Sequence, residues 1–239
     1  MAAVTLLSAR GLSRNFGGLR AVHDVDFDLA EGEIRALIGP NGAGKTTFVG
    51  MLCGRIAPTA GSVSFGGKDI SSLPAHRRAR LGIAYTFQIT SVFRKLSVHE
   101  NVALAAGARL SSPARLRKAV NTALDRVGLS DRAEQLAGDL AYGHQRLLEI
   151  AMGISQNPKL LILDEPTQGL SDGEIENFKT LVRDLAKQSA VLIIEHNMDV
   201  VMQTADRITV LAAGEILAEG SPQDIRANAA VQAAYLGTG

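Results

Sequence analysis

The sequence predicts an α/β fold with a mostly parallel sheet into which a block of helices is inserted. Short, continuous apolar runs suited to parallel strands buried on both faces alternate with segments of helical periodicity. Between residues 89 and about 158 the pattern is mainly helical, which indicates an insertion between core strands. Polar residues follow several apolar runs, and α/β sheets bind ligands at the carboxyl ends of their strands.

The N-terminal part, from Val4 to about Val63, opens with strand patterns. Around residue 27, three apolar residues alternate with three aspartates, which is the period of a half-buried strand. Gly17 and Gly18 supply the turn before this strand. Phe16 stands at the turn, and two interpretations remain open: an exposed ring that stacks on a nucleotide base, or a core phenylalanine.

The remaining elements follow from the same patterns. The other predicted strands are Ile34–Ile38, Val63–Phe65, Ile83–Phe87, Leu160–Leu163, Val191–Ile194 and Ile208–Leu211. Helices are predicted at Phe48–Leu52, at Ala75–Leu81 with Pro74 as first residue, within 89–158, at Asp172–Gln188 and from Pro222. Ala213–Glu215 is a predicted hairpin turn.

Composition and charge narrow the function classes. The 239 residues are 46% hydrophobic and 21% charged, as in a folded globular chain. A net charge of +1 supplies no global field for a nucleic acid or an anionic membrane. The single cysteine, Cys53, fits a reducing compartment and is interpreted as a packing residue.

The sequence also bears on location. The N-terminus lacks the basic region of a signal peptide, and no apolar run approaches the ~18 residues that cross a bilayer. We therefore expect a cytoplasmic protein that reaches a membrane only through a partner.

The stretch that follows Ile34–Ile38 carries the strongest chemical signal. It predicts a phosphate-binding P-loop, whose glycines let successive backbone N–H groups turn toward a phosphate at a helix N-terminus. Lys45 adds an ammonium for the β- and γ-phosphates, and Thr46 a hydroxyl for Mg²⁺. An ordinary glycine turn is the alternative, which the other strand ends disfavour. The P-loop residues are Gly39, Pro40, Asn41, Gly42, Ala43, Gly44, Lys45, Thr46 and Thr47.

Three further strand ends carry candidate catalytic residues. Asp164 follows four apolar residues and is predicted to hold Mg²⁺, with Glu165 beside it as the base or orienting group for a water in line with the γ-phosphate. His196 ends another strand, where a neutral imidazole donates one hydrogen bond to that phosphate. An acidic pair leaving the core and a structural histidine are the alternatives. Gln88 ends the predicted strand Ile83–Phe87.

Together these residues resemble the ATP-binding cassette (ABC) transporter ATPases over nearly the whole chain. The resemblance lies in Gly39–Thr47, Gln88, Leu140–Gln145, Leu160–Thr167 and His196. A narrower resemblance, to the ATPase subunits of branched-chain (hydrophobic) amino-acid importers, lies in Tyr85–Gln88, Tyr142–Ala151, Glu195–Met198 and Ala234–Gly237.

The resemblance implies a P-loop NTPase core with an antiparallel β edge subdomain and an inserted helical subdomain. Residues 1–88 and 159–239 would form the core, and 89–158 the helical part. It also implies ATP and Mg²⁺ as cofactors and head-to-tail pairing with a second ATPase subunit, identical or paralogous. The P-loop of one subunit and the signature of the other, Ala141, Tyr142, Gly143 and His144, would enclose one ATP.

Further partners are implied by the same resemblance. Gln88 would join the Mg²⁺ site and, through Ile89–Lys95, transmit closure to integral-membrane permease subunits docked on the helical block, so that the chain sits on the cytoplasmic face of the membrane. A solute-binding protein would act indirectly, and no nucleic acid is expected. The basic residues Arg77, Arg78, Arg80, Arg94 and Lys95 are interpreted as a solvated face rather than part of the docking surface.

Three positions depart from the family pattern. Ala141 stands where a serine is common, His144 where glutamine is, and Ser171 where an acid or asparagine is. We still expect an ATP hydrolase that drives uptake of branched-chain or other hydrophobic amino acids. The alternatives are an ATPase for urea or amide import or for lipid export, a soluble cassette protein acting on nucleic acid, and a regulatory module without turnover.

Overall fold

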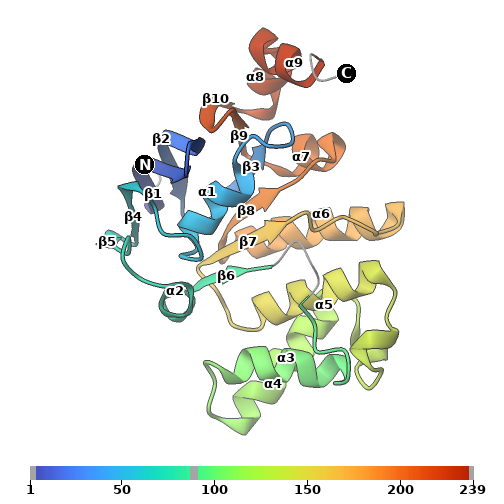
Figure 1. Ribbon diagram of the computed structural model, residues 1–239. Coiled ribbons are helices and arrows are strands. Elements are labelled where there is room, and N and C mark those ends of the chain that lie inside the picture. Colours follow the sequence, from blue (N-terminus) through green and yellow to red (C-terminus); the bar gives the residue numbers. More distant parts are fainter. Residues whose placement is uncertain (1–3, 87–90, 237–239) are drawn as a thin grey trace.

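The computed structural model describes residues 4–86 and 91–236 (Figure 1). The strands are β1 (Thr5–Phe16), β2 (Leu19–Ala30), β3 (Ile34–Ile38), β4 (Ala60–Phe65), β5 (Lys68–Asp69), β6 (Ile83–Tyr85), β7 (Leu160–Asp164), β8 (Ala190–Ile194), β9 (Arg207–Ala212) and β10 (Glu215–Gly220). The α-helices are α1 (Lys45–Leu52), α2 (Ala75–Leu81), α3 (Val98–Gly107), α4 (Pro113–Arg126), α5 (Tyr142–Ile154), α6 (Asp172–Ala186), α7 (Met198–Thr204), α8 (Pro222–Ala227) and α9 (Ala229–Leu236). Two 3₁₀ turns, Ser130–Arg132 and Ala137–Asp139, lie between α4 and α5.

Two sheets organise the chain. The larger has the order β10-β9-β3-β8-β7-β6, and its neighbours pair in parallel except for the antiparallel β10. The smaller, β2-β1-β4-β5, is antiparallel. Helices α3, α4 and α5 gather below the larger sheet, as Figure 1 shows. The predicted α/β class, with a mostly parallel sheet, an antiparallel part and inserted helices, is confirmed.

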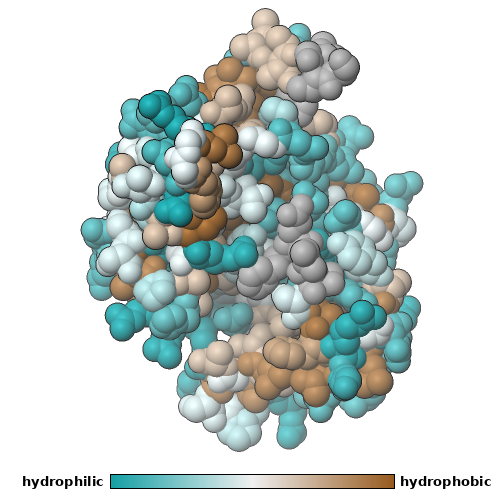
Figure 2. All heavy atoms as spheres, viewed as in Figure 1, coloured by the Kyte–Doolittle hydropathy of each residue, from teal (hydrophilic) through white to brown (hydrophobic). Residues whose placement is uncertain are grey.

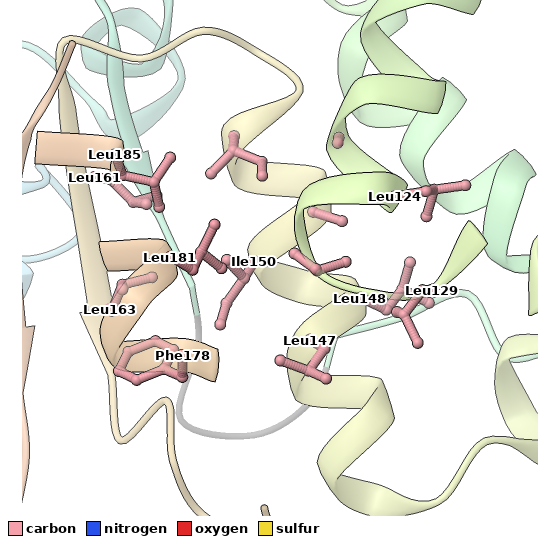
Figure 3. Close-up of a cluster of buried hydrophobic side chains, with 14 of the residues drawn as sticks. Leu124, Leu129, Leu147, Leu148, Ile150, Leu161, Leu163, Phe178, Leu181 and Leu185 are labelled. Carbon is pink, nitrogen blue, oxygen red and sulfur yellow. The ribbon is translucent and has the colours of Figure 1, made fainter. Parts of the chain in front are cut away.

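The core forms because the strands of the larger sheet are apolar on both faces. Along β7, Leu160 and Ile162 pack into the cluster that surrounds α1 and the smaller sheet. Leu161 and Leu163 face the other way, into the cluster that α5 and α6 complete (Figure 3). Side chains of a strand alternate between its faces, so a continuous apolar run is what a sheet covered on both sides requires.

The solvated basic face predicted for Arg78 is wrong. Its side chain is buried and donates to four carbonyl oxygens, those of Met51 (2.8 Å), Leu52 (2.8 Å), Leu73 (2.8 Å) and Ser71 (3.0 Å). The first two belong to the C-terminal end of α1, where helix carbonyls lack partners within the helix and attract positive charge. Arg78 therefore anchors the end of α1.

Several element boundaries differ from the expectation. Strand β6 ends at Tyr85, while Phe87 and Gln88 lie outside the described residues. Pro74 caps α2 from outside the helix, and α6 stops at Ala186. Helices α7 and α9 were not predicted, because each is at most eight residues long, which is too short for a helical period to be distinguished. Within residues 4–86 and 91–236, every helix is too short or too polar to cross a membrane.

Candidate active site

A pocket of about 350 Å³ opens at the carboxyl ends of β3, β7 and β8. It brings together most of the residues predicted from the strand ends and excludes the predicted signature. Gln88 lies outside the described residues. Predicted site residues that line the pocket are Phe16, Asn41, Gly42, Ala43, Gly44, Lys45, Thr46, Thr47, Asp164, Glu165 and His196.

The P-loop packs closely against two strands, β9 and β2. A Cβ on Gly39 would lie 2.1 Å from the carbonyl oxygen of Leu211 in β9, and one on Gly44 would lie 2.3 Å from that of Ala21 in β2. Both glycines also have positive φ angles, 153° and 96°. A larger residue at either position would therefore displace the loop. An ordinary glycine turn that faces solvent would accommodate the same substitution.

Lys45 begins α1 and turns its side chain back over the loop. Its Nζ donates to the carbonyl oxygens of Gly39 (2.6 Å) and Pro40 (3.0 Å). Burial lowers the pKa of Lys45, and the nearby carboxylates of Glu165 and Asp164 oppose that shift. Because an anion would pair with this buried ammonium and with the free N–H groups of the helix N-terminus, the site suits a phosphate.

Asp164 is buried beside the pocket, and Tyr85 on the neighbouring strand orients it. The Tyr85 hydroxyl donates to Oδ2 of Asp164 at 2.7 Å. Burial raises the pKa of Asp164, with a further contribution from the charge of Glu165 and an opposing one from the Tyr85 hydrogen bond. The Asp164 carboxylate and the exposed Thr46 hydroxyl are oxygen ligands of the kind that Mg²⁺ prefers, so the residues present fit that ion.

Glu165 and His196 approach each other across two loops. Oε1 of Glu165 lies 3.4 Å from Nε2 of His196, and the histidine side chain is half exposed. Glu165 has a φ of 49°, unusual for a residue with a side chain, and its N–H donates to the Ile194 carbonyl oxygen at 2.8 Å. Backbone strain of this kind is often found where a side chain must point into a site.

Glu195 holds both of these loops, a role that the sequence did not reveal. Its Oε1 accepts from the Thr167 N–H (3.0 Å) and from the Thr167 hydroxyl, while Oε2 accepts from the N–H groups of His196 (2.8 Å) and Asn197 (3.0 Å). The side chain is buried. The available signals were a glutamate directly after the apolar strand β8 and a tyrosine as the last residue of β6.

The predicted signature residues Ala141, Tyr142, Gly143 and His144 lie outside this pocket, at the start of α5. The helix begins at Tyr142, with Ala141 at its N-cap position. A Cβ on Gly143 would lie 2.4 Å from the Gly169 carbonyl oxygen, so the signature packs against the loop that follows Glu165. Contact of these residues with the ATP of a second subunit stays a prediction.

His144 faces α6 of its own chain. Its Nε2 lies 3.0 Å from Oε1 of Glu174, and Oε2 of Glu174 accepts from the N–H and hydroxyl of Ser171 at 2.7 Å each. Ser171 thus caps α6, which gives a physical reason for a serine at this departing position. The Ser171 hydroxyl, then its N–H, and to a smaller degree the charge of His144, hold the pKa of Glu174 below its usual range.

We expect His144→Gln to flatten the pH profile of ATP turnover. A carboxyl with a lowered folded pKa contributes its stabilisation above its usual pKa and loses it only as the pH falls through the lowered value. Glu174 therefore stays charged while a histidine changes charge, between about pH 5 and 8. Glutamine also donates to Glu174 but never changes charge. Turnover of the two proteins should be measured across this range, and an identical profile would remove the pH role of His144.

Two family models match the sequence. The model described as "ABC transporter" matches residues 22–168, which include the P-loop, the signature and Asp164–Glu165. A second, described as "Branched-chain amino acid ATP-binding cassette transporter", matches residues 215–239. Together the two models cover the segments that carry the resemblance, except His196 and Glu195–Met198, which lie between the matched ranges.

Curated relatives match almost the full chain. The sequence is 41% identical over 250 residues to the high-affinity branched-chain amino acid transport ATP-binding protein LivG of Salmonella typhimurium, covering 97% of this chain and 98% of LivG. It is 40% identical over 249 residues to BraF of Pseudomonas aeruginosa, a protein of the same description, with the same coverage of both chains.

Solved structures show the same fold. The ADP conformation of MJ1267, an ATP-binding cassette of an ABC transporter, superposes with a TM-score of 0.87 at 28% identity. The match covers 98% of this chain and 99% of MJ1267. The arrangement of two sheets and inserted helices is therefore that of a nucleotide-binding cassette.

Proposed function

This chain belongs to the ABC transporter ATPase family, and we propose that it powers the uptake of branched-chain or other hydrophobic amino acids. The observation that carries the proposal is the pocket in which the P-loop, Asp164, Glu165 and His196 meet. The match of residues 215–239 to the branched-chain model supports this class of solute over urea, amides or lipids. Glu165 and His196 in the pocket favour turnover over a purely regulatory role.

In the proposed reaction, Lys45 and the N-terminus of α1 hold the β- and γ-phosphates of ATP. Thr46 and Asp164, with Gln88, would hold Mg²⁺, which would neutralise charge on the phosphates. Glu165 orients a water and takes its proton as the water oxygen bonds to the γ-phosphorus, while the bond to the ADP oxygen breaks and its electron pair leaves with ADP. His196 donates a hydrogen bond to the γ-phosphate, and the Phe16 ring, exposed in the pocket, stacks on the base.

The proposed assembly contains a second ATPase subunit. The cassette MJ0796 forms a dimer in its solved structures, and we infer that this chain pairs in the same way and acts with membrane permease subunits. We infer that Ala141–His144 of each subunit faces the ATP held by the P-loop of the other, because α5 begins there and presents its N-terminal N–H groups. Closure of both sites around ATP would then move the permease subunits, from the cytoplasmic face of the membrane.

The permease surface is proposed to include three exposed apolar residues of the helical part, Phe93, Leu104 and Leu136. Figure 2 shows hydrophobic side chains gathered over α3 at the lower part of the visible face. Residues 93–97 run beside 135–138, joined by the N–H of Ala137 to the Leu96 carbonyl oxygen (2.9 Å) and that of Gly138 to the Arg94 carbonyl oxygen (3.0 Å). Apolar patches on a soluble surface commonly mark partner sites.

Co-purification from native membranes tests this proposal. We expect permease subunits to co-purify with the parent chain and not with the Phe93→Asp variant. The basal ATP turnover of the variant, measured by phosphate release, should equal that of the parent. Leu217→Asp is the matched control, because Leu217 is another exposed apolar residue but lies on β10. A parent chain that binds no membrane protein, or that releases no phosphate from ATP, would contradict the proposed function.

A further inference from the structure

A buried ion pair on α5 has no part in the site described above. Arg146 and Glu149 are 2% and 5% exposed, and NH1 of Arg146 lies 2.9 Å from Oε2 of Glu149. Their neighbours on the helix are apolar core residues, Leu147, Leu148 and Ile150. Removing two charges from water is costly, and apolar residues of similar size are often as stable, so stability alone does not account for the pair.

Glu149 connects the pair to the chain that follows residues 87–90. Its Oε1 accepts hydrogen bonds from the Ser91 N–H (2.6 Å) and the Ser91 hydroxyl (3.1 Å). Phe93, two residues after Ser91, is held by the buried Asn101 of α3. The Asn101 side chain accepts a hydrogen bond from the Phe93 N–H (2.7 Å) and donates one to the Phe93 carbonyl oxygen (3.1 Å). Residues 91–93 are thus held to α5 and α3 by two buried polar side chains, while the Phe93 side chain is exposed.

Arg146 extends the connection to the loop that follows Glu165. Its NH2 donates to the Tyr142 hydroxyl at 3.2 Å, and that hydroxyl donates to Oε1 of Gln168 at 3.0 Å. The guanidinium carbon also lies 5.5 Å from the centre of the Tyr142 ring. The Tyr142 ring also lies close to Gly169, where a Cβ would lie 2.6 Å from Cδ1 of Tyr142.

We propose that Arg146 and Glu149 are positioning residues that couple the membrane-partner surface to the ATP-facing segments of the same chain. A displacement of Phe93 would pass through Ser91 to Glu149, then through Arg146 and Tyr142 to Gln168. Both the signature and the loop after Glu165 lie on this path, so the permease and the ATP sites change together. This inference rests on the proposed function, which supplies the permease partner and the ATP turnover.

The double variant Arg146→Met/Glu149→Met tests the proposal in the complex with its permease subunits. Two apolar side chains replace the pair without leaving one buried charge alone, so we expect the fold to be retained. We expect the KM for MgATP to change by less than about twofold, while stimulation of turnover by the permease falls about tenfold, equivalent to about 1.4 kcal/mol of coupling. Stimulation equal to that of the parent would overturn the proposal.

The matched control is Glu176→Met/Lys179→Met, because that ion pair has the same spacing but lies on α6, away from the path. We expect it to leave the stimulation unchanged, and an equal loss in this control would overturn the assignment to the α5 pair.

A second experiment uses exposed residues at the two ends of the path, Ser91 and Gln168. We expect Ser91→Ala and Gln168→Met each to lower the stimulation, and the combined variant to lose less than the product of the two. Independent effects that multiply would overturn the path, since uncoupled distant sites behave additively in free energy.

Hydrogen exchange on the full chain without partners separates this inference from the proposed function. In the Arg146→Met/Glu149→Met variant we expect faster exchange in both 91–97 and 166–171. Faster exchange in 91–97 alone would show a local structural role and overturn the proposal, even if the parent hydrolyses ATP. A parent chain without ATP turnover contradicts the proposed function and leaves this measurement intact as the test of the path.

Discussion

A Glu165→Gln variant is expected to bind ATP normally while its turnover falls about 10²–10⁴-fold, the usual range for a lost general base. Glutamine keeps the size of the side chain and can still hydrogen-bond to a water, but it cannot take the proton. Glu165 is suited to this role because its positive φ and the Ile194 hydrogen bond fix it beside His196 in the pocket.

Phosphate release at saturating ATP measures the turnover, and calorimetric titration measures the binding. Glu176→Gln is a useful control, since it removes an exposed carboxylate of α6 that lies outside the pocket. Turnover of the Glu165→Gln variant within tenfold of the parent would remove Glu165 from the role of general base.

Lys45→Ala is expected to abolish measurable ATP affinity. The ammonium is the buried positive charge of the loop, and its carbonyl partners, Gly39 and Pro40, cannot hold a phosphate in its place. Charge-assisted hydrogen bonds to phosphate are among the strongest that a side chain makes, and the alanine variant loses them without a substitute.

Calorimetric titration with ATP and Mg²⁺ is the measurement. Lys68→Ala is the control, because Lys68 is an exposed lysine on β5, outside the pocket. Unaltered ATP binding by the Lys45→Ala variant would contradict the assignment of residues 39–47 as a phosphate-binding loop.

The fold was largely predictable because its strands are strongly patterned. The run Leu160–Leu163 is apolar at every position, and both of its faces are covered in the structure. The alternating residues around Phe27 likewise form a strand with one buried face. Such patterns depend on the spacing of apolar residues along the chain, which a sequence displays directly.

The candidate site was predictable to the extent that its residues follow strands. The P-loop, Asp164, Glu165 and His196 lie at the carboxyl ends of parallel strands, and the sheet brings those ends together. Hydrogen bonds between residues that are distant in the sequence could not be predicted in this way. The bond from Tyr85 to Asp164 and that from Arg78 to the end of α1 depend on packing between elements 79 and 27 residues apart.

His144 illustrates the same limit. Its position in the signature indicated a partner subunit, whereas its observed contact is Glu174 of its own chain, 3.0 Å away on α6. Nothing in the local sequence around residue 144 specifies which helix packs beside it. The capping role of Ser171 was not predicted either. The sequence did contain a signal for it, because a serine followed three residues later by a glutamate is typical of a helix start.

The anchoring of α1 by Arg78 has a consequence for how tightly a nucleotide can bind. Close backbone contacts hold the loop before the helix, and the Arg78 guanidinium holds the carbonyls at the other end. A loop fixed before its ligand arrives loses little conformational entropy on binding, so more of the interaction energy remains as affinity. A residue far from any phosphate would thereby contribute to the strength with which ATP is held.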